Sequence, residues 1–429
     1  MHFNMNKFFK VTFFSALYTL LKMISGFIIG KFVALYTGPS GIATLGQLQG
    51  LVNILNGIVT APVGSGVVRY TAVNKDNGIE KCAPWWRASV FVSFCIYLVA
   101  LLTMLLFSKY ISLKFFGTEK FNILIVFASV VLPLSVLNTV LSSILNGLQQ
   151  YKKYILLGML SVSTSTILIV YFVMKFSLWG ALVATCLNTT VAGIVLFLFC
   201  YKELWLKWRN LIGGFEKQNL RGILGFSLMA FVTAISTPIA LLFIRNILIK
   251  NTGWDDAGQW QAVWKISEVY LSVMTMALST YFLPRLSSLQ DSVKIKKEVN
   301  SVSLYILIIT CLLSIIVYLF RDFIISVLFT EEFKEARDLF LYQLIGDVLK
   351  IAGFLYAYPM IAQGRLKVFI ISEILFALSF VGMVAYFVKQ YGVQGANIGY
   401  LVNYIVYFSF AFVFTNYINL KIDEQEKIK

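Results

Sequence analysis

Charged side chains occur inside apolar segments that are long enough to cross a bilayer, and these are the residues that could do chemistry. They are five cations and three carboxylates: Lys22, Lys31, Arg245, Lys265 and Lys350, with Glu268, Asp347 and Glu373. A charge at the centre of a spanning helix costs about 2.5–3.5 kcal/mol, so it normally faces a cavity or a partner. Because Lys and Arg are the usual partners of phosphate, the surplus of cations predicts an anionic, phosphate-bearing ligand.

Helical spacing places several of these charges on shared faces. One polar stripe consists of Gln261, Lys265, Glu268 and Ser272, and a second consists of Gln343, Asp347 and Lys350. Intervals of three and four residues put side chains on one helix face, so each stripe is expected to face the protein interior. An alternative is that Lys265–Glu268 and Asp347–Lys350 are ion pairs one turn apart. That alternative is compatible with lining a wet cavity.

Three cations are not explained by such pairing. Lys22 and Arg245 have no carboxylate one turn away, which favours a role in binding an anion. Lys31 lies near the outer end of its segment, and extension toward the lipid headgroups explains it about as well as ligand binding does.

Aromatic and neutral polar side chains complete the predicted site. Trp260 and Trp264 lie one turn apart, either in an interfacial aromatic belt or as a surface for sugar rings. Asn53 and Asn56, together with Gln261 and Gln343, are predicted to line the path of a polar headgroup. The expected substrate-binding set therefore combines cations for phosphate with amides and aromatic rings for sugars.

Composition excludes most other classes of protein. Of the 429 residues, 59% are hydrophobic and 13% charged, whereas a soluble domain carries about 25% charged residues. A soluble fold of this make-up would expose large apolar patches, so a soluble enzyme is excluded. His2 is the only histidine, and the five cysteines form no CxxC motif. We therefore expect no metal site, no cofactor and no Ser-His catalytic site.

Hydropathy predicts twelve membrane spans. They lie near 10–36, 43–67, 88–108, 121–147, 154–174, 178–201, 222–249, 258–284, 301–320, 339–362, 368–388 and 393–418. With both termini and the even-numbered connections on one side, that side holds 22 of the 36 Lys and Arg residues and the other side nine. The positive-inside rule places the first side, and both termini, in the cytoplasm. This asymmetry explains the net charge of +16 better than a nucleic-acid partner does.

Two short matches indicate an internal duplication. Gly46-Gln47-Leu48-Gln49 is repeated as Gly258-Gln259-Trp260-Gln261, and Leu35-Tyr36-Thr37-Gly38 corresponds to Lys250-Asn251-Thr252-Gly253. Both offsets are close to half the chain length. We therefore expect an all-α protein with two six-helix lobes, 1–211 and 212–429, related by an axis along the membrane normal, with the ligand held between them.

Motifs of a known family occur in both halves of the chain. The segments are Gly30-Lys31 through Thr37-Gly38-Pro39-Ser40-Gly41, Trp254-Asp255-Asp256-Ala257-Gly258 with Trp260-Gln261, Ile266-Ser267-Glu268-Val269-Tyr270-Leu271, Tyr281-Phe282-Leu283-Pro284-Arg285-Leu286-Ser287, and Arg337-Asp338-Leu339-Phe340 into Gln343-Leu344-Ile345-Gly346-Asp347-Val348-Leu349-Lys350. On these motifs, the chain resembles Wzx-type flippases of O-antigen and enterobacterial common antigen units. These flippases belong to the multidrug/oligosaccharidyl-lipid/polysaccharide exporter superfamily.

The resemblance implies a V-shaped, two-lobe transporter of the bacterial inner membrane. Its implied substrate is an oligosaccharide unit on undecaprenyl diphosphate, moved from the cytoplasmic to the periplasmic leaflet by alternating access. A polysaccharide polymerase and a chain-length regulator are implied partners. Lys31, Glu268, Asp347 and Lys350 fall in matching motifs, and Lys22 matches a basic position of the family's first helix. Glu268 and Asp347 are candidates for coupling to an ion gradient. The family has a small polar residue where this chain has Lys265, which leaves Lys265 without a family role or links it to the particular sugar.

Two other functions compete with this one. A drug exporter of the same fold is expected to carry an inward surplus of carboxylates, and this chain has the reverse. A membrane glycan polymerase or ligase usually has a sizeable periplasmic loop rich in Arg and His, whereas the longest outer loops predicted here are near 109–120 and 321–338.

Overall fold

Every regular element in the described part of the chain is a helix, which confirms the all-α prediction. The computed structural model describes residues 5–278, 282–287, 289, 292–363 and 365–418. Several residues used in the sequence predictions lie outside this part: His2, Tyr281 and both chain ends, including Lys421, Lys427 and Lys429.

The helices form two compact units, and each is described separately. The first comprises Met1–Thr37 and Thr44–Ile239, and the second comprises Gly38–Ala43 and Ala240–Lys429. The helix α8 (Lys217–Thr252) belongs to both, because the chain passes from one unit to the other inside it.

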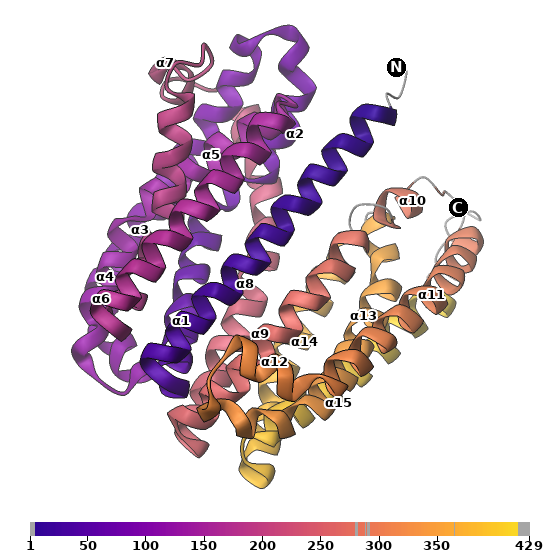
Figure 1. Ribbon diagram of the computed structural model, residues 1–429. Helices are drawn as coiled ribbons and strands as arrows, with labels where there is room; N and C mark the ends of the chain where they lie inside the picture. Colours follow the sequence, from indigo (N-terminus) through magenta and orange to yellow (C-terminus); the bar gives the residue numbers. More distant parts are fainter. Residues whose placement is uncertain (1–4, 279–281, 288, 290–291, 364, 419–429) are drawn as a thin grey trace. The chain divides into compact units, whose positions relative to one another are not determined.

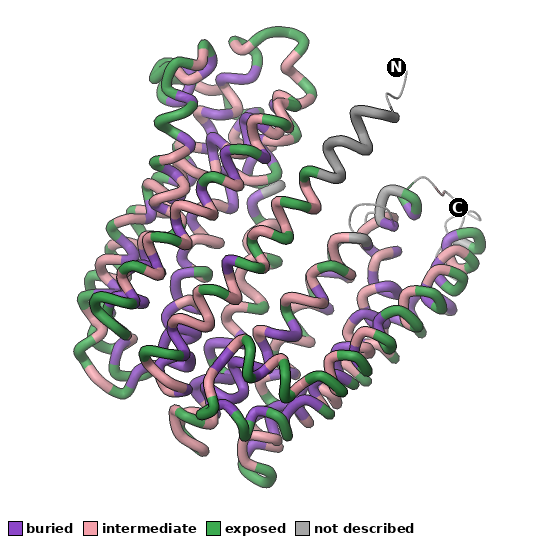
Figure 2. The backbone as a smooth tube through the Cα atoms, viewed as in Figure 1, coloured by how far each residue is buried: buried purple, intermediate pink, exposed green. Residues whose placement is uncertain are grey.

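The first unit contains a core that includes Trp86 and Trp205. Figure 1 labels its helices, and Figure 2 shows buried residues along them. Its elements are α1 (Met5–Thr60), η1 (Ala61–Val63), α2 (Ser65–Asn74), η2 (Lys75–Asn77), α3 (Ile79–Phe116), η3 (Glu119–Phe121), α4 (Asn122–Val130), α5 (Leu132–Gly147), α6 (Tyr151–Cys200), α7 (Trp208–Leu211) and the start of α8. The Trp86 indole donates a hydrogen bond of 2.8 Å to Thr71 Oγ1. The polar edge of this fully buried ring is therefore satisfied, as burial requires.

The second unit has a core of aliphatic and tyrosine side chains. Its elements are the end of α8, α9 (Trp254–Ala277), α10 (Leu283–Ser287), α11 (Ser292–Leu319), α12 (Arg321–Leu328), η5 (Glu331–Leu339), α13 (Phe340–Ala362), α14 (Leu366–Tyr391), α15 (Gln394–Val413) and η6 (Phe414–Ile418). Tyr407 of α15 packs between Phe354 and Phe376, with ring centroids 6.2 and 4.9 Å away. These contacts join α13, α14 and α15 around one buried seam.

Nine helical segments of the described chain are long and apolar enough to cross a membrane. Two of them hold two predicted spans each, because α1 is interrupted at Gly38 and α6 at Ser177, where the backbone is not helical. At 1.5 Å per residue, the 56 residues of α1 would otherwise extend about 84 Å, far beyond a hydrocarbon core of about 30 Å. The predicted span at 258–284 begins in α9, which is not among the nine segments that are apolar enough to cross a membrane. The number twelve stays a prediction.

The interruption in α1 brings two sequence motifs together. Gly38 adopts φ 63°, a left-handed conformation that glycine tolerates, and Pro39 follows without a backbone N–H. The segment Gly38–Ala43 belongs to the second unit, where Pro39 packs against α9. A Cβ on Gly258 would lie 2.0 Å from the Pro39 carbonyl oxygen, so only glycine permits this approach.

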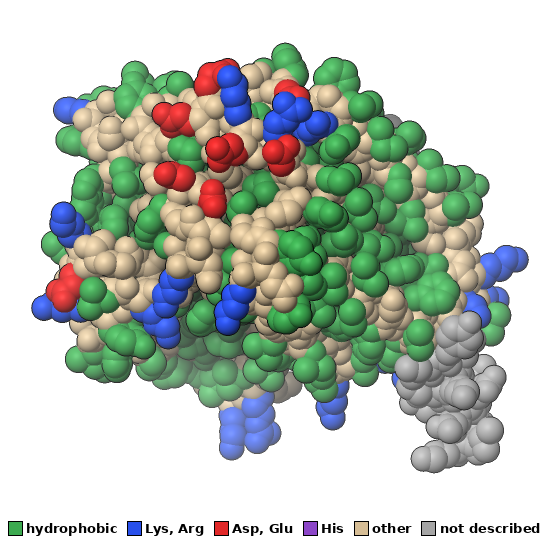
Figure 3. All heavy atoms as spheres, turned by 90° about the horizontal axis from the view of Figure 1, so that it is seen from below, with side chains coloured by type: hydrophobic (Ala, Val, Ile, Leu, Met, Phe, Trp, Pro, Cys, Tyr) green, Lys and Arg blue, Asp and Glu red, His purple; other side chains and the backbone are tan. Residues whose placement is uncertain are grey.

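Large apolar side chains cover the outside of both units, as Figure 3 shows for one face. Leu106, Ile167 and Leu319 are each about 70% exposed, which is expected of helices solvated by lipid. The exposed carboxylates of the second unit concentrate on the first turn of α9 and on η5, at Asp255, Glu331, Glu332, Glu335 and Asp338. The nearby Gln259 amide donates a 2.7 Å hydrogen bond to the Glu332 carbonyl, which fixes η5 beside α9.

Close approach of α5 and α6 gives a prediction about stability. A Cβ on Gly193 would lie 2.3 Å from the Leu134 carbonyl oxygen, so Gly193→Ala must push the two helices apart at a cost of about 1–3 kcal/mol. The purified protein in detergent should therefore unfold at a lower temperature. Gly382→Ala is the matched control, because nothing lies within 4 Å of its Cβ position and alanine favours a helix. Equal unfolding midpoints for the two variants would contradict this packing.

Candidate functional site

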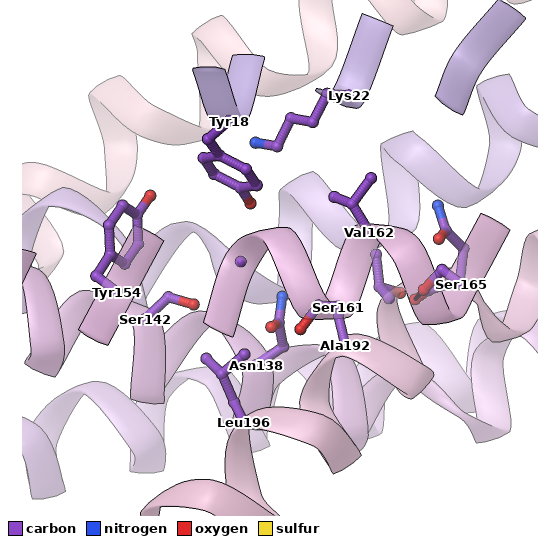
Figure 4. A pocket seen from close by; sticks show the side chains of 13 residues that line it. Tyr18, Lys22, Asn138, Ser142, Tyr154, Ser161, Val162, Ser165, Ala192 and Leu196 are labelled. Carbon is purple, nitrogen blue, oxygen red and sulfur yellow. Dashed lines mark hydrogen bonds between the residues drawn. The ribbon is translucent and has the colours of Figure 1, made fainter. Parts of the chain in front are cut away.

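A polar cavity of about 290 Å³ lies inside the first unit, between α1, α5 and α6. Figure 4 shows Tyr18 and Lys22 of α1 on one side of it and Asn138, Ser161 and Leu196 on the other. The lining residues are Tyr18, Lys22, Asn138, Ser142, Tyr154, Gly158, Ser161, Val162, Ser165, Asn188, Thr189, Ala192 and Leu196. Most of these side chains carry a hydroxyl, an amide or an ammonium group.

Lys22 supplies the charge of this cavity. Its Nζ lies 4.1 Å from the centroid of the Tyr18 ring, which is a cation–π contact. No carboxylate offsets the charge locally, because none of the thirteen lining residues is acidic. Gly158 makes room for the Tyr18 ring, since a Cβ there would lie 2.6 Å from Tyr18 Cζ. The lysine is therefore positioned by an aromatic ring and remains available to an anion.

Hydrogen-bonding groups line the rest of the cavity. Ser165 Oγ donates a 3.3 Å bond to the Asn188 carbonyl, and Thr189 Oγ1 lies 2.5 Å from Ser135 Oγ. The buried Ser161 Oγ has no hydrogen-bond partner among the described residues. A buried hydroxyl normally has a partner in the protein, water or a ligand. The cavity can therefore accept a polar ligand.

Asp347 is the centre of a second polar cluster, inside the second unit. Its side chain is fully buried and accepts hydrogen bonds from the Tyr270 hydroxyl at 2.6 Å, the Tyr400 hydroxyl at 2.7 Å and the Gln343 amide at 3.2 Å. An ionised carboxylate offers about four acceptor sites, and these three donors occupy most of them. Gln343 and Asp347 thus lie together on the interior face of α13, as the stripe predicts.

Lys350 lies one turn beyond Asp347, among aromatic rings. Its Nζ is 5.3 Å from the Trp264 ring centroid, 5.5 Å from that of Tyr404 and 5.8 Å from that of Tyr400. Cation–π contacts of this kind stabilise an ammonium group that is removed from water. Lys350 of the second polar stripe therefore contacts Trp264, which is on the same helix as the first stripe.

Within the described chain, the two stripes do not form the direct ion pairs of the alternative interpretation. Neither Lys265–Glu268 nor Asp347–Lys350 is among the ion pairs that the side chains form. Glu268 instead accepts a 2.9 Å hydrogen bond from the Trp264 indole, and Asp347 uses its tyrosine partners. Aromatic N–H and O–H groups, together with the Gln343 amide, therefore donate the hydrogen bonds that these two carboxylates accept.

Arg245 and the two tryptophans are buried in the second unit. Arg245 is 3% exposed, and its Nη1 donates a 3.0 Å hydrogen bond to Gln261 Oε1. Trp260 and Trp264 are also buried, with ring centroids 5.3 Å apart, and Trp264 packs edge-on against Tyr400. Contact between these rings and a sugar would require them to be uncovered, and stays a prediction.

The other predicted residues lie apart from the cavity. Lys31, Asn53 and Asn56 are on α1, where Asn53 is exposed and the other two are half-buried, and Lys265 is half-buried on α9. None of the four lines the cavity. The prediction from sequence also missed the polar lining of α5 and α6. Pairs one turn apart within apolar helices, Asn138–Ser142 and Ser161–Ser165, were the available signal.

The two units differ in the balance of their intramembrane charges. Arg245, Lys265 and Lys350 share the second unit with the equal number of carboxylates Glu268, Asp347 and Glu373. Both remaining cations, Lys22 and Lys31, are in the first unit, which contributes none of the carboxylates of the predicted set. The surplus of positive charge therefore resides in the first unit.

Known proteins of similar sequence and structure cover nearly the whole chain. The lipid III flippase of Escherichia coli K12 is 28% identical over 93% of this chain and 96% of its own length. An inward-facing multidrug resistance transporter of the MATE family and MOP superfamily has a TM-score of 0.75 and 18% identity, covering 94% of this chain and 95% of its own. The lipid II flippase MurJ, in an inward closed conformation, has a TM-score of 0.73 and 14% identity, covering 95% of this chain and 87% of its own.

These structural similarities show that the chain shares the fold of these transporters. A family model described as polysaccharide biosynthesis protein matches residues 43–338, which is more than half of the chain. The chain therefore belongs to this family of polysaccharide biosynthesis proteins.

Proposed function

We propose that the protein is a flippase for an O-antigen-type oligosaccharide unit linked to undecaprenyl diphosphate. It would carry this unit from the cytoplasmic to the periplasmic leaflet of the bacterial inner membrane. The observation that carries the proposal is Lys22, an ammonium group without a local carboxylate, beside a cavity of amides and hydroxyls. Two comparisons support it: the E. coli relative is named lipid III flippase, and the family that matches this chain is described as polysaccharide biosynthesis protein.

Alternating access explains how these residues would act. Lys22, Lys31 and Arg245 would attract the diphosphate, and the glycan would follow into polar surroundings while the polyprenyl tail stays in lipid. Rocking of two lobes, predicted as 1–211 and 212–429, would then expose the headgroup on the other side. No covalent bond changes. The released unit would pass to a polysaccharide polymerase and a chain-length regulator. Glu268 and Asp347 are proposed as coupling carboxylates.

The charge of the cavity separates this proposal from drug export. A cationic drug would be repelled by Lys22 and would find no carboxylate among the lining residues, whereas a phosphate is attracted by the same ammonium group. A glycan polymerase or ligase remains a distinct outcome of the cell experiment below.

Charge asymmetry supports cytoplasmic termini. The exposed carboxylates of α9 and η5 lie at one end of the second unit. Arg285, Lys294, Lys296 and Lys297 lie on α10 and α11, which follow once the chain has crossed the membrane in α9. The positive-inside rule places the basic end in the cytoplasm. A phosphatase reporter, active only outside the cytoplasm, should be inactive after residue 429 and active when inserted at Glu335. The reverse pattern would refute this orientation.

Cells that lack the protein should accumulate lipid-linked units on the cytoplasmic face. Their surface polysaccharide should disappear, and the undecaprenyl-diphosphate glycan should be inaccessible to a periplasmic glycan-modifying enzyme. Restoring the gene should reverse both effects. If the units instead stand on the periplasmic face but are not linked together, the protein is a polymerase or ligase and the flippase proposal fails.

Loss of a phosphate-binding cation should abolish transport. Lys22→Ala and Arg245→Ala should each reduce surface polysaccharide by about tenfold or more, because a charge-assisted hydrogen bond contributes about 1.5–3 kcal/mol. Membrane levels of both variants are measured by immunoblot, and Arg245→Lys tests whether charge alone suffices at this buried position. Lys109→Ala, at an exposed position of α3, is the control and should behave as wild type. Normal polysaccharide from Lys22→Ala and Arg245→Ala would exclude them from the site.

A further inference from the structure

We propose that the cavity inside the first unit binds the sugar that is attached directly to the diphosphate, and so contributes to the choice of glycan. This inference rests on the proposed function and deepens it. None of Asn138, Ser142, Ser161 or Asn188 was among the residues predicted from sequence, yet the fold gathers all four around Lys22.

The lining has the chemistry that a sugar ring requires. The amides of Asn138 and Asn188 each offer two N–H donors and a carbonyl acceptor, which matches hydroxyl groups that both donate and accept. Ser161 Oγ is buried and has no hydrogen-bond partner among the described residues. A ligand hydroxyl or a water can therefore supply its missing hydrogen bond. Tyr18 and Tyr154 add aromatic rings beside these polar groups. Amides, hydroxyls and rings together favour a carbohydrate over a simple anion.

The position of Lys22 specifies which sugar is bound. Its side chain is exposed at the edge of the cavity, whereas Ser161, Ser165 and Leu196 are buried in the wall. A diphosphate held at Lys22 can therefore remain outside while the ring bonded to it enters. This arrangement is suited to the sugar next to the phosphate.

The volume limits the cavity to a small part of the glycan. The space is about 290 Å³. One sugar ring with its substituents is of this order, whereas an oligosaccharide unit is larger. The remaining sugars would lie outside the cavity.

Binding measurements with two lipids test the inference. The probes are the lipid-linked glycan extracted from cells that lack the protein, and undecaprenyl diphosphate without sugar. Affinities are measured for the full-length protein in nanodiscs. Asn138→Leu removes the amide at similar volume and should weaken binding of the glycan lipid roughly tenfold, while the affinity for the sugarless lipid stays within about twofold. Lys22→Gln should weaken binding of both lipids.

A filling variant checks that the cavity itself is occupied. Ala192→Phe places a ring in the cavity, and should lower the affinity for the glycan lipid alone. Ile194→Phe is the matched control, because Ile194 lies on the same helix, is 43% exposed and does not line the cavity. It should change neither affinity.

The outcomes separate this inference from the proposed function. If Asn138→Leu and Ala192→Phe leave the affinity for the glycan lipid unchanged, or weaken both lipids equally, the cavity does not bind the sugar. The flippase proposal then still stands on accumulation of cytoplasmic lipid-linked units. If cells without the protein accumulate no such units, the proposed function fails first, and the inference with it.

Discussion

The cost of burying an unpaired charge governs the polar architecture of this protein. In the second unit, cations and carboxylates of the predicted set are equal in number, and the fully buried Asp347 is satisfied by tyrosine and glutamine donors. In the first unit, Lys22 has an aromatic neighbour but no acidic residue in its cavity. The predicted set therefore has no net charge in the second unit and a net positive charge in the first, which is the charge that the proposed anionic ligand requires.

Small residues make this arrangement possible. A Cβ on Gly346 would lie 2.4 Å from Tyr400 Cδ1, so the glycine allows the ring to approach α13 and its hydroxyl to reach Asp347. Gly158 does the same for Tyr18, and thereby for Lys22. Helices in a membrane associate mainly through close packing and interhelical hydrogen bonds, and here the packing contacts also position the polar groups. The same glycines therefore serve helix packing and the placement of the polar side chains.

Sequence reasoning could predict the local features of the fold, because they depend on nearby residues. Apolar segments, the break near Gly38 and the interior faces carrying Gln261 and Gln343 all follow from composition and helical spacing. The partners of the buried carboxylates could not be predicted in this way. Spacing pairs Asp347 with Lys350, but Tyr270 and Tyr400 reach the carboxylate from other helices. The cavity depends in the same way on α1, α5 and α6, which are brought together only by the tertiary fold.

The residues that connect the two units are different from the residues that line the cavity. The chain enters and leaves the second unit around Gly38–Ala43 and passes into it again within α8, just after Pro238. Gly38 interrupts helical geometry, and a proline inside a helix lacks one backbone hydrogen bond, so both connections are locally weaker than the helices they join. The residues of the cavity, in contrast, belong to one compact unit. The proposed alternating access would require this division, because the proposed sugar site would have to keep its geometry while the connections bend.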